Sequence, residues 1–289
     1  MKKKSIGLLL LVIMMVSVMA GCSSASNEKV KLAYVAWDSE IASSYVVKEV
    51  LESKLGATVE MLQVDAGPMW AGVADGSADA MVAAWLPSTH AAYVEKYGSK
   101  VEDLGANLKG TKVGLAVPTY MDINSIEDLK NADLASKLSN RIIGIEPGAG
   151  IMTTTEKAIA EYGLSEYTLL ESSSAAMAQE LQKAYDNNEP IVVTGWTPHW
   201  MFANMDLKYL DDPKGVYGAD EQIHTMVRQG LKDDMPKVYQ LLDQFEWTAD
   251  DMAQVMVEIQ GGKSPEDAAK TWVENNQDKV DAWTQGIEL

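Results

Sequence analysis

The sequence has 289 residues, of which 47% are hydrophobic, and its 24 basic and 42 acidic side chains give a formal net charge of −18. A chain this acidic repels nucleic acid and anionic lipid, which argues against both as partners. The acidic residues are scattered along the chain, so we interpret them as a source of solubility. A single cysteine excludes a disulfide within the chain, and stability must therefore come from a buried core.

The N-terminal segment has the parts of a secretory signal: lysines at 2–4, an apolar run over 6–18 and small residues before Cys22. The apolar run is too short to span a bilayer. Small residues directly before a cysteine resemble the lipobox of bacterial lipoproteins, which implies cleavage before Cys22 and a diacylglyceryl group on it. We predict an extracytoplasmic chain that is lipid-anchored to the cell membrane, with a signal peptide over 1–21 and a tether over 22–29. The alternative is an ordinary secretory peptide in which Cys22 is incidental.

One pattern occurs twice in the rest of the chain, over 31–87 and over 141–198. In each unit strands and helices alternate as β-α-β-α-β, and a glycine, Gly56 or Gly163, follows the first helix. This alternation is typical of parallel sheets with helical crossovers. We therefore predict an α/β fold with two lobes and a ligand cleft between them.

The segments between and after the two units are expected to join the lobes. Residues 113–117 are predicted to form one crossing strand and residues 221–231 a second. The tail over 232–289 shows helical periodicity with capping residues at the helix starts. The expected divisions are lobe 1 over 30–115 plus 222–289, and lobe 2 over 116–221.

Three tryptophans are placed at the ends of predicted strands. Trp85 and Trp196 each begin a Trp-x-Pro motif that closes a unit, and Trp37 follows the first strand. Ligands of open α/β sheets bind beyond the carboxyl ends of the strands, so we expect all three rings in one cleft. Tryptophan faces suit a quaternary ammonium group and attract it by about 0.5–2 kcal/mol per ring. The alternative is that these rings only anchor the core.

Two further features indicate an anion site in the same cleft. The turn "EPGAGIM" over 146–152 puts Gly150 and Ile151 at a helix start, where free N–H groups can hold a carboxylate. His90, in the "PSTH" stretch after Trp85, can donate a hydrogen bond from its imidazole. The alternatives are a plain β–α turn and a surface or helix-capping histidine.

Other residues near these motifs are interpreted as structural. Asp38 and Glu40 are expected to cap the helix after Trp37, although Glu40 can also face the cleft. Trp70 is expected to pack within its lobe or to lie at the cleft rim. The residues expected in the core or in structural roles elsewhere are Trp200, Trp247, Trp272, Trp283, His199 and His224.

The sequence contains no metal-ligand spacing, no nucleophile elbow and no phosphate loop. We therefore predict no metal, no cofactor and no catalytic activity. One rival is a hydrolase in the cleft, which would need a paired nucleophile and base. Another is an adhesin or structural lipoprotein, whose melting temperature would not depend on a ligand.

Several stretches together resemble the glycine betaine-binding lipoproteins of bacterial ABC osmoprotectant importers. These are "LAYVAWDSEIASS", "AGPMWAGVADGSADAMVAAWLPSTHAAY", "GLAVPTYM", "IIGIEPGAGIM" and "TGWTPHWMFANMDLKYLDDPK". The resemblance spans nearly all of the mature chain. It implies the type II periplasmic-binding-protein fold, in which two α/β lobes close over the ligand, and ABC permease subunits as partners.

The resemblance also implies roles for individual residues. A prism of Trp37, Trp85 and Trp196 would hold the trimethylammonium group. The ligand carboxylate would be taken by the N–H groups of Gly150 and Ile151 and by His90. We expect glycine betaine and related betaines, such as proline betaine, as ligands. The alternative is a binder of choline or carnitine, although binders of those ligands in the wider group use tyrosine-rich cages that this sequence lacks.

Overall fold

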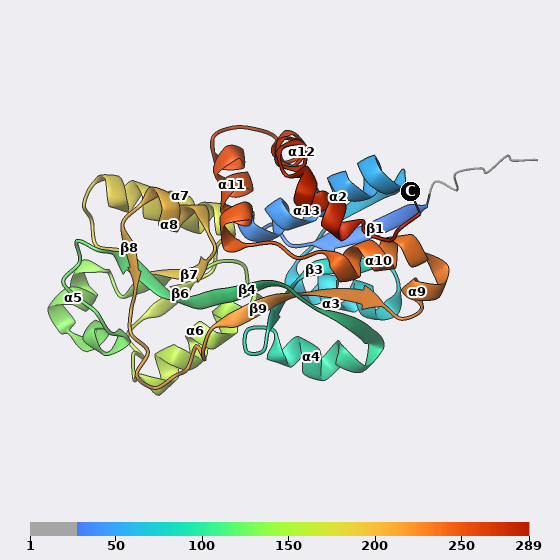
Figure 1. Ribbon diagram of the computed structural model, residues 1–289. Coiled ribbons are helices and arrows are strands. Elements are labelled where there is room, and N and C mark those ends of the chain that lie inside the picture. The colour runs from blue at the N-terminus through green and yellow to red at the C-terminus, as the bar shows by residue number, and fades with distance from the viewer. Residues whose placement is uncertain (1–27, 289) are drawn as a thin grey trace, which may run out of the picture.

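The computed structural model describes residues 28–288, and Cys22 with the predicted signal peptide lies outside them. Two groups of strands and helices are joined at the centre by two long strands (Figure 1). Within residues 28–288, no helix combines the length and apolar character that crossing a membrane requires.

Lobe 1 is built on three parallel strands, β1 (Lys29–Tyr34), β2 (Thr58–Gln63) and β3 (Ala80–Leu86). The strand β1 lies between the other two, and the crossovers are α2 (Asp38–Leu55) and α3 (Ala66–Asp75). The helix α2 ends where a glycine adopts the left-handed conformation, with φ of 66°. The first predicted unit is thus confirmed in its order of elements.

Lobe 2 repeats this arrangement with β5 (Arg141–Ile143), β6 (Thr168–Leu170) and β7 (Val193–Thr197). The strand β5 pairs in parallel with β6 and β7. Its crossover helices are α6 (Gly150–Glu161) and α7 (Ser174–Asp186). In both lobes the peptide bond before the proline of Trp-x-Pro is cis.

Two antiparallel strands, β4 (Val101–Pro118) and β9 (Glu221–Arg228), link the lobes. They merge both halves into one sheet of order β2-β1-β3-β9-β4-β7-β5-β6, with β8 (Leu207–Tyr209) on the far end of β4. The sheet is therefore mixed, parallel within each lobe and antiparallel at its centre. Thr111 of β4 pairs with Glu221 of β9, so the chain enters and leaves lobe 2 at neighbouring positions. The exact lobe boundaries stay a prediction.

The predicted crossing strand over 113–117 was too short, because β4 has 18 residues. Its first half pairs with β9 and its second half with β7 and β8. The predicted second crossing corresponds to β9, which ends at Arg228.

Between residues 229 and 288 the chain forms five helices on the lobe 1 side, and α11 and α12 pack against α2. Trp272 and Trp283 stack with ring centroids 5.6 Å apart, and Trp247 meets Trp272 edge to face. All three are buried, which confirms their predicted core position. These helices are α9 (Leu231–Asp234), α10 (Pro236–Gln244), α11 (Ala249–Gln260), α12 (Pro265–Asn275) and α13 (Gln277–Trp283).

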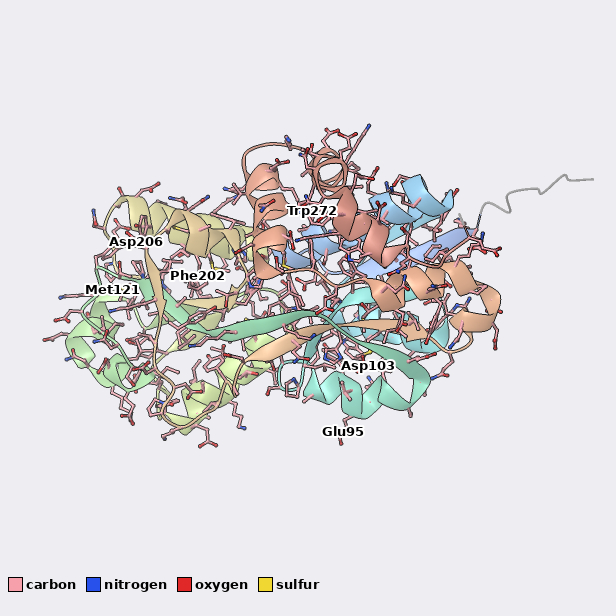
Figure 2. All side chains as sticks on the ribbon, in the orientation of Figure 1. Glu95, Asp103, Met121, Phe202, Asp206 and Trp272 are labelled. Atoms are coloured by element: carbon pink, nitrogen blue, oxygen red, sulfur yellow. The ribbon has the colours of Figure 1, made fainter. Side chains whose placement is uncertain are left out.

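Shorter helical segments complete the chain, and charged side chains such as Glu95 extend from its outline (Figure 2). Ser125 caps one of these segments through a capping box with Asp128. The segments are α4 (Ala91–Tyr97), η1 (Gly98–Lys100), η2 (Ile126–Lys130), α5 (Ala132–Lys137) and α8 (Trp200–Asn204).

Candidate functional site

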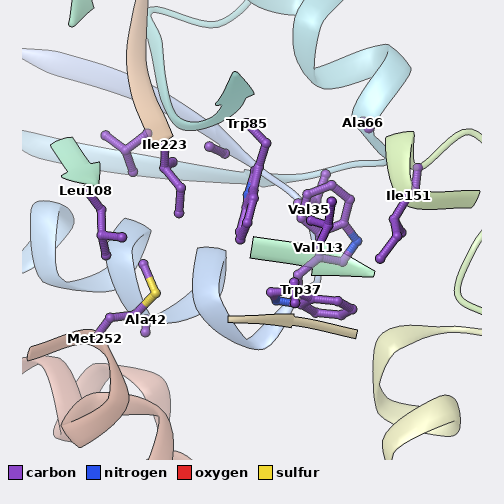
Figure 3. Close-up of a cluster of buried hydrophobic side chains, with 14 of the residues drawn as sticks. Val35, Trp37, Ala42, Ala66, Trp85, Leu108, Val113, Ile151, Ile223 and Met252 are labelled. Carbon is purple, nitrogen blue, oxygen red and sulfur yellow. The ribbon is translucent and has the colours of Figure 1, made fainter. Parts of the chain in front are cut away.

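The three predicted tryptophans meet where the lobes face each other. Trp37 precedes α2, Trp85 lies in β3 and Trp196 lies in β7, and each is at most 5% exposed. The rings of Trp37 and Trp196 have centroids 6.3 Å apart and are tilted by 53°. Figure 3 shows Trp37 and Trp85 beside Val113 and Ile151. The residues that line the cavity between the rings are Trp37, Trp85, Thr89, Val113, Ile145, Ile151 and Trp196.

The cavity is apolar and small, at about 20 Å³. That volume accommodates about one water molecule. Hydrogen bonds join the two lobes around the cavity, from Tyr93 to the Gly148 carbonyl and from Ser174 and Trp200 to Asp38. The structure corresponds to a closed arrangement of the lobes.

Each indole N–H of the cage donates to an acceptor outside the cavity. Trp37 Nε1 donates to Glu146 Oε1 at 2.5 Å, Trp85 Nε1 to Glu40 Oε1 at 2.7 Å and Trp196 Nε1 to Ser39 Oγ at 3.1 Å. The polar edge of each ring is thus occupied. The cavity is left with aromatic faces, which are the negative part of the ring quadrupole.

His90 lies beside this cage and is fully buried. Its Nδ1 accepts hydrogen bonds from Trp70 Nε1 at 3.3 Å and from the Trp85 backbone N–H at 3.1 Å. The ring proton must therefore be on Nε2. That buried Nε2 has no hydrogen-bond partner within residues 28–288. Burial lowers the pKa of His90 to about 3, so the imidazole is a neutral donor with a free N–H.

Trp70 is fully buried behind His90, which settles the two interpretations of its position in favour of packing. It also stacks on Tyr93, with ring centroids 6.1 Å apart. The hydroxyl of Tyr93 reaches across the cleft and donates to the Gly148 carbonyl at 2.7 Å. The edge of the cage is therefore bonded to the turn before α6.

The start of α6 approaches the His90 loop from the opposite lobe. Gly150 and Ile151 are its first two helical residues, and N–H groups at these positions have no partner within a helix. A Cβ on Gly150 would lie 2.1 Å from the Thr89 carbonyl oxygen, so only glycine permits this approach. Thr89 precedes His90 directly. The loop before His90 is thus in contact with the helix start that carries the other donors proposed for a carboxylate.

The predicted helix caps were wrong, because α2 has no side-chain cap hydrogen bond. Asp38 instead accepts from Ser174 Oγ at 3.0 Å and from Trp200 Nε1 at 2.9 Å, both in lobe 2. Burial opposes ionisation of Asp38, but the nearby His199 and the hydrogen bonds from Ser174 and Trp200 outweigh it and keep its pKa below the usual range. Asp38 therefore joins the lobes in this closed arrangement, and Glu40 contacts Trp85.

Three residues that sequence reasoning missed support the site. Glu146 holds Trp37, as described above, and burial raises its pKa despite the hydrogen bond from Trp37. Glu221, at the start of β9, accepts from the backbone N–H groups of Ser88 and Thr89 at 2.6 and 2.7 Å, which fixes the loop before His90. The third is Ser39. No local pattern marks them, because their partners are distant in sequence.

The other two histidines have the structural roles that were predicted. His199 accepts from the Met201 backbone N–H and caps α8, while its Nε2 lies 3.3 Å from Asp38 Oδ2. His224 pairs with Asp103 at 2.9 Å. No cluster of side chains within residues 28–288 has the composition of a metal site.

Comparisons with known proteins give a consistent result. The chain is 56% identical over 158 residues to the glycine betaine/carnitine transport binding protein GbuC of Listeria monocytogenes, and this match covers 54% of the chain and 53% of the relative. It thus spans about half the length of that relative. The fold is similar to lactococcal OpuAC in a closed conformation with glycine betaine, with TM-score 0.85, 49% identity and coverage of 89% of this chain and 100% of the other.

A choline-binding protein in complex with choline is also similar, with TM-score 0.84, 27% identity and coverage of 91% of this chain and 93% of the other. These likenesses confirm the expected two-lobe fold. The family model for the substrate-binding domain of ABC-type glycine betaine transport systems matches residues 28–275. The chain therefore belongs to this OpuAC family of transport substrate-binding domains.

Proposed function

We propose that this protein is the extracytoplasmic binding protein of an ABC importer and that it binds glycine betaine and related betaines, such as proline betaine, for osmoprotection. The observation that carries the proposal is the pairing of an apolar tryptophan cage with the unpartnered N–H of His90. A trimethylammonium group suits the cage, because it donates no hydrogen bond and is attracted to aromatic faces. A carboxylate suits the hydrogen-bond donors beside the cage, because it accepts hydrogen bonds and carries a negative charge.

The carboxylate end would be bound by His90 Nε2 and by the N–H groups of Gly150 and Ile151. A neutral imidazole donor and helix N-terminal amides bind a carboxylate without burying an unpaired positive charge. Because the cage residues and these donors come from both lobes, one ligand would bridge the cleft. Closure removes water from both ends of the zwitterion and strengthens both sets of contacts. The closed form would then dock on the permease, without any chemical step.

Calorimetry on the mature chain tests this proposal. Titrations with glycine betaine, dimethylglycine, sarcosine and glycine should show stepwise weaker binding, because each lost methyl exposes an N–H that the cage cannot satisfy. Tryptophan fluorescence should change on binding of glycine betaine. The absence of both heat and fluorescence change would refute the proposal, as would equal affinities for glycine and glycine betaine.

Choline is the second candidate, because the fold is similar to a choline-binding protein in complex with choline. Choline lacks a carboxylate. If it were the true ligand, His90→Ala would hardly change its affinity. If glycine betaine is the ligand, the same substitution should weaken binding strongly while choline remains a poor ligand of both proteins.

The predicted lipid anchor at Cys22 belongs to the same proposal. A tether after Cys22 would keep the binding protein near its permease at the outer side of the cell membrane. In cells, the parent should be labelled by a fatty-acid probe and Cys22→Ser should abolish that labelling. Labelling that persists in the variant, or an unlabelled parent, would contradict the anchor and leave ligand binding untouched.

A further inference from the structure

A buried carboxylate connects two rings of the cage. Glu40, in the first turn of α2, is fully buried. Its Oε1 accepts from Trp85 Nε1 at 2.7 Å, and its Oε2 accepts from the hydroxyl of Ser39. The oxygen of that hydroxyl accepts in turn from Trp196 Nε1 at 3.1 Å. One acid therefore holds a ring of lobe 1 directly and a ring of lobe 2 through Ser39.

This carboxylate has no basic partner among the described side chains, since its hydrogen-bond donors are neutral. The nearest charged neighbour in sequence, Asp38, is itself acidic. Burial raises the pKa of Glu40 to about 7, because desolvation outweighs the hydrogen bonds from Ser39 and Trp85. A buried acid without a cation is costly, which calls for a compensating charge.

The indole rings can extend the electrostatic effect of the Glu40 carboxylate to the cavity. An indole whose N–H donates to a carboxylate is polarised, and electron density rises on its face. The faces of Trp85 and Trp196 line the cavity, while their N–H edges point to the acid and its serine. A quaternary ammonium group shielded by methyl groups cannot contact a carboxylate by hydrogen bonding, so an anion on the far side of the rings suits it.

We propose that Glu40 is the counter-ion of the cage: it positions Trp85 and Trp196 and selects a cationic head group over a neutral head group of the same shape. This inference rests on the proposed binding of a quaternary ammonium group. It adds a residue that lies outside the cavity lining. A charge pair separated by several ångströms in a partly shielded interior corresponds to about a ten- to fiftyfold preference.

The test compares glycine betaine with tert-butylacetate, in which carbon replaces the ammonium nitrogen and the carboxylate is kept. Glu40→Gln removes the charge but keeps the size of the side chain. We expect this variant to bind glycine betaine about ten- to fiftyfold more weakly and tert-butylacetate about as well as the parent does. Glu95→Gln, at an exposed glutamate of α4, is the matched control, because it removes the same charge far from the cage and should leave the binding of both ligands unchanged.

Equal weakening of both ligands by Glu40→Gln would overturn the proposal, because it would show that Glu40 only spaces the rings. Unchanged binding of both would overturn it as well. The parent titration separates this outcome from the proposed function: if the parent does not bind glycine betaine, it is the function that fails.

A measurement on the parent protein keeps the inference testable if the variant does not fold. Near pH 7, glycine betaine should release a proton from Glu40, and tert-butylacetate should release none, as read by calorimetry in two buffers of different ionisation heat. The other titratable groups around this site are Asp38, His90, Glu146 and His199. Both ligands carry the carboxylate that faces His90, so its response cancels in the comparison. Equal proton release on binding of the two ligands would contradict the proposal that Glu40 is the counter-ion.

Discussion

In the protein without ligand, Glu40 should make the folded state less stable as the pH rises. Its pKa is raised from the ordinary value of 4.5 to about 7, so the folded state binds the proton more tightly than the unfolded chain does. The stabilisation is complete below the unfolded value and is lost as the pH rises from 4.5 to about 7. At 1.36 kcal/mol per pKa unit this interval corresponds to roughly 3 kcal/mol, a large share of a typical domain's stability.

Glu40→Gln removes this titration. Urea unfolding of parent and variant at about pH 5, 6.5 and 8 gives the difference in their free energies of unfolding. That difference should shift in favour of the variant by about 2–3 kcal/mol between the lowest and the highest pH. Asp38 and the other titrating groups are present in both proteins and largely cancel. Glu95→Gln, at an exposed glutamate of α4, is the control and should show no such shift.

A pH-independent difference between parent and Glu40→Gln would refute this reasoning, because it would mean that the acid titrates alike in the folded and unfolded states. Combined with the weaker betaine binding expected above, the predicted result would be a variant whose stability relative to the parent rises towards pH 8 and that binds glycine betaine more weakly. The buried acid would then be kept for binding at the expense of stability.

Three further predictions concern other parts of the site. His90→Ala should lower the affinity for glycine betaine, measured by calorimetry, about ten- to a hundredfold, because it removes one hydrogen bond to a charged group. A loss of affinity below about threefold would exclude that hydrogen bond. Gly150→Ala should nearly abolish the binding of glycine betaine, since the added Cβ would lie 2.1 Å from the Thr89 carbonyl oxygen. A variant with normal affinity and an unchanged melting temperature would contradict this expectation. Asp38→Asn weakens the hydrogen bonds from Ser174 and Trp200 that join the lobes, so small-angle scattering should show a more open protein and the affinity for glycine betaine should fall severalfold. Identical scattering of parent and variant in the absence of ligand would show that these bonds do not hold the lobes together.

The repeat of strands and helices could be predicted from the sequence, because it depends on local periodicity and on stop signals such as Gly56 and Gly163. The strand β4 could not be predicted in full. Its first half contains Gly105 and Gly110, which resemble turn residues and have φ of 100° and 76°. Both lie beside register shifts in the pairing with β9, where such a conformation is accommodated. The antiparallel centre of the sheet depends on that distant pairing and has no local signal.

The cage could be predicted because Trp85 and Trp196 occupy equivalent strand ends. The groups that orient the rings could not. The bond from Trp196 to Ser39 joins residues 157 positions apart, and the bond from Trp200 to Asp38 joins residues 162 apart. An acidic residue after a strand is more often a helix cap, and only the three-dimensional arrangement shows that Asp38 and Glu40 bond to indoles instead.

The pairing of Thr111 with Glu221 has a consequence for recombination between relatives. Because the chain enters and leaves lobe 2 at adjacent points, that lobe is an insert whose ends match a single junction. Exchanging it for the equivalent part of another family member would bring in a new Trp196 equivalent and a new α6 start. Trp37, Trp85 and His90 would remain. In such chimeras, each lobe's part of the binding site comes from a different parent protein. Comparing the ligands that a chimera binds with those of its two parents would show which lobe determines ligand specificity.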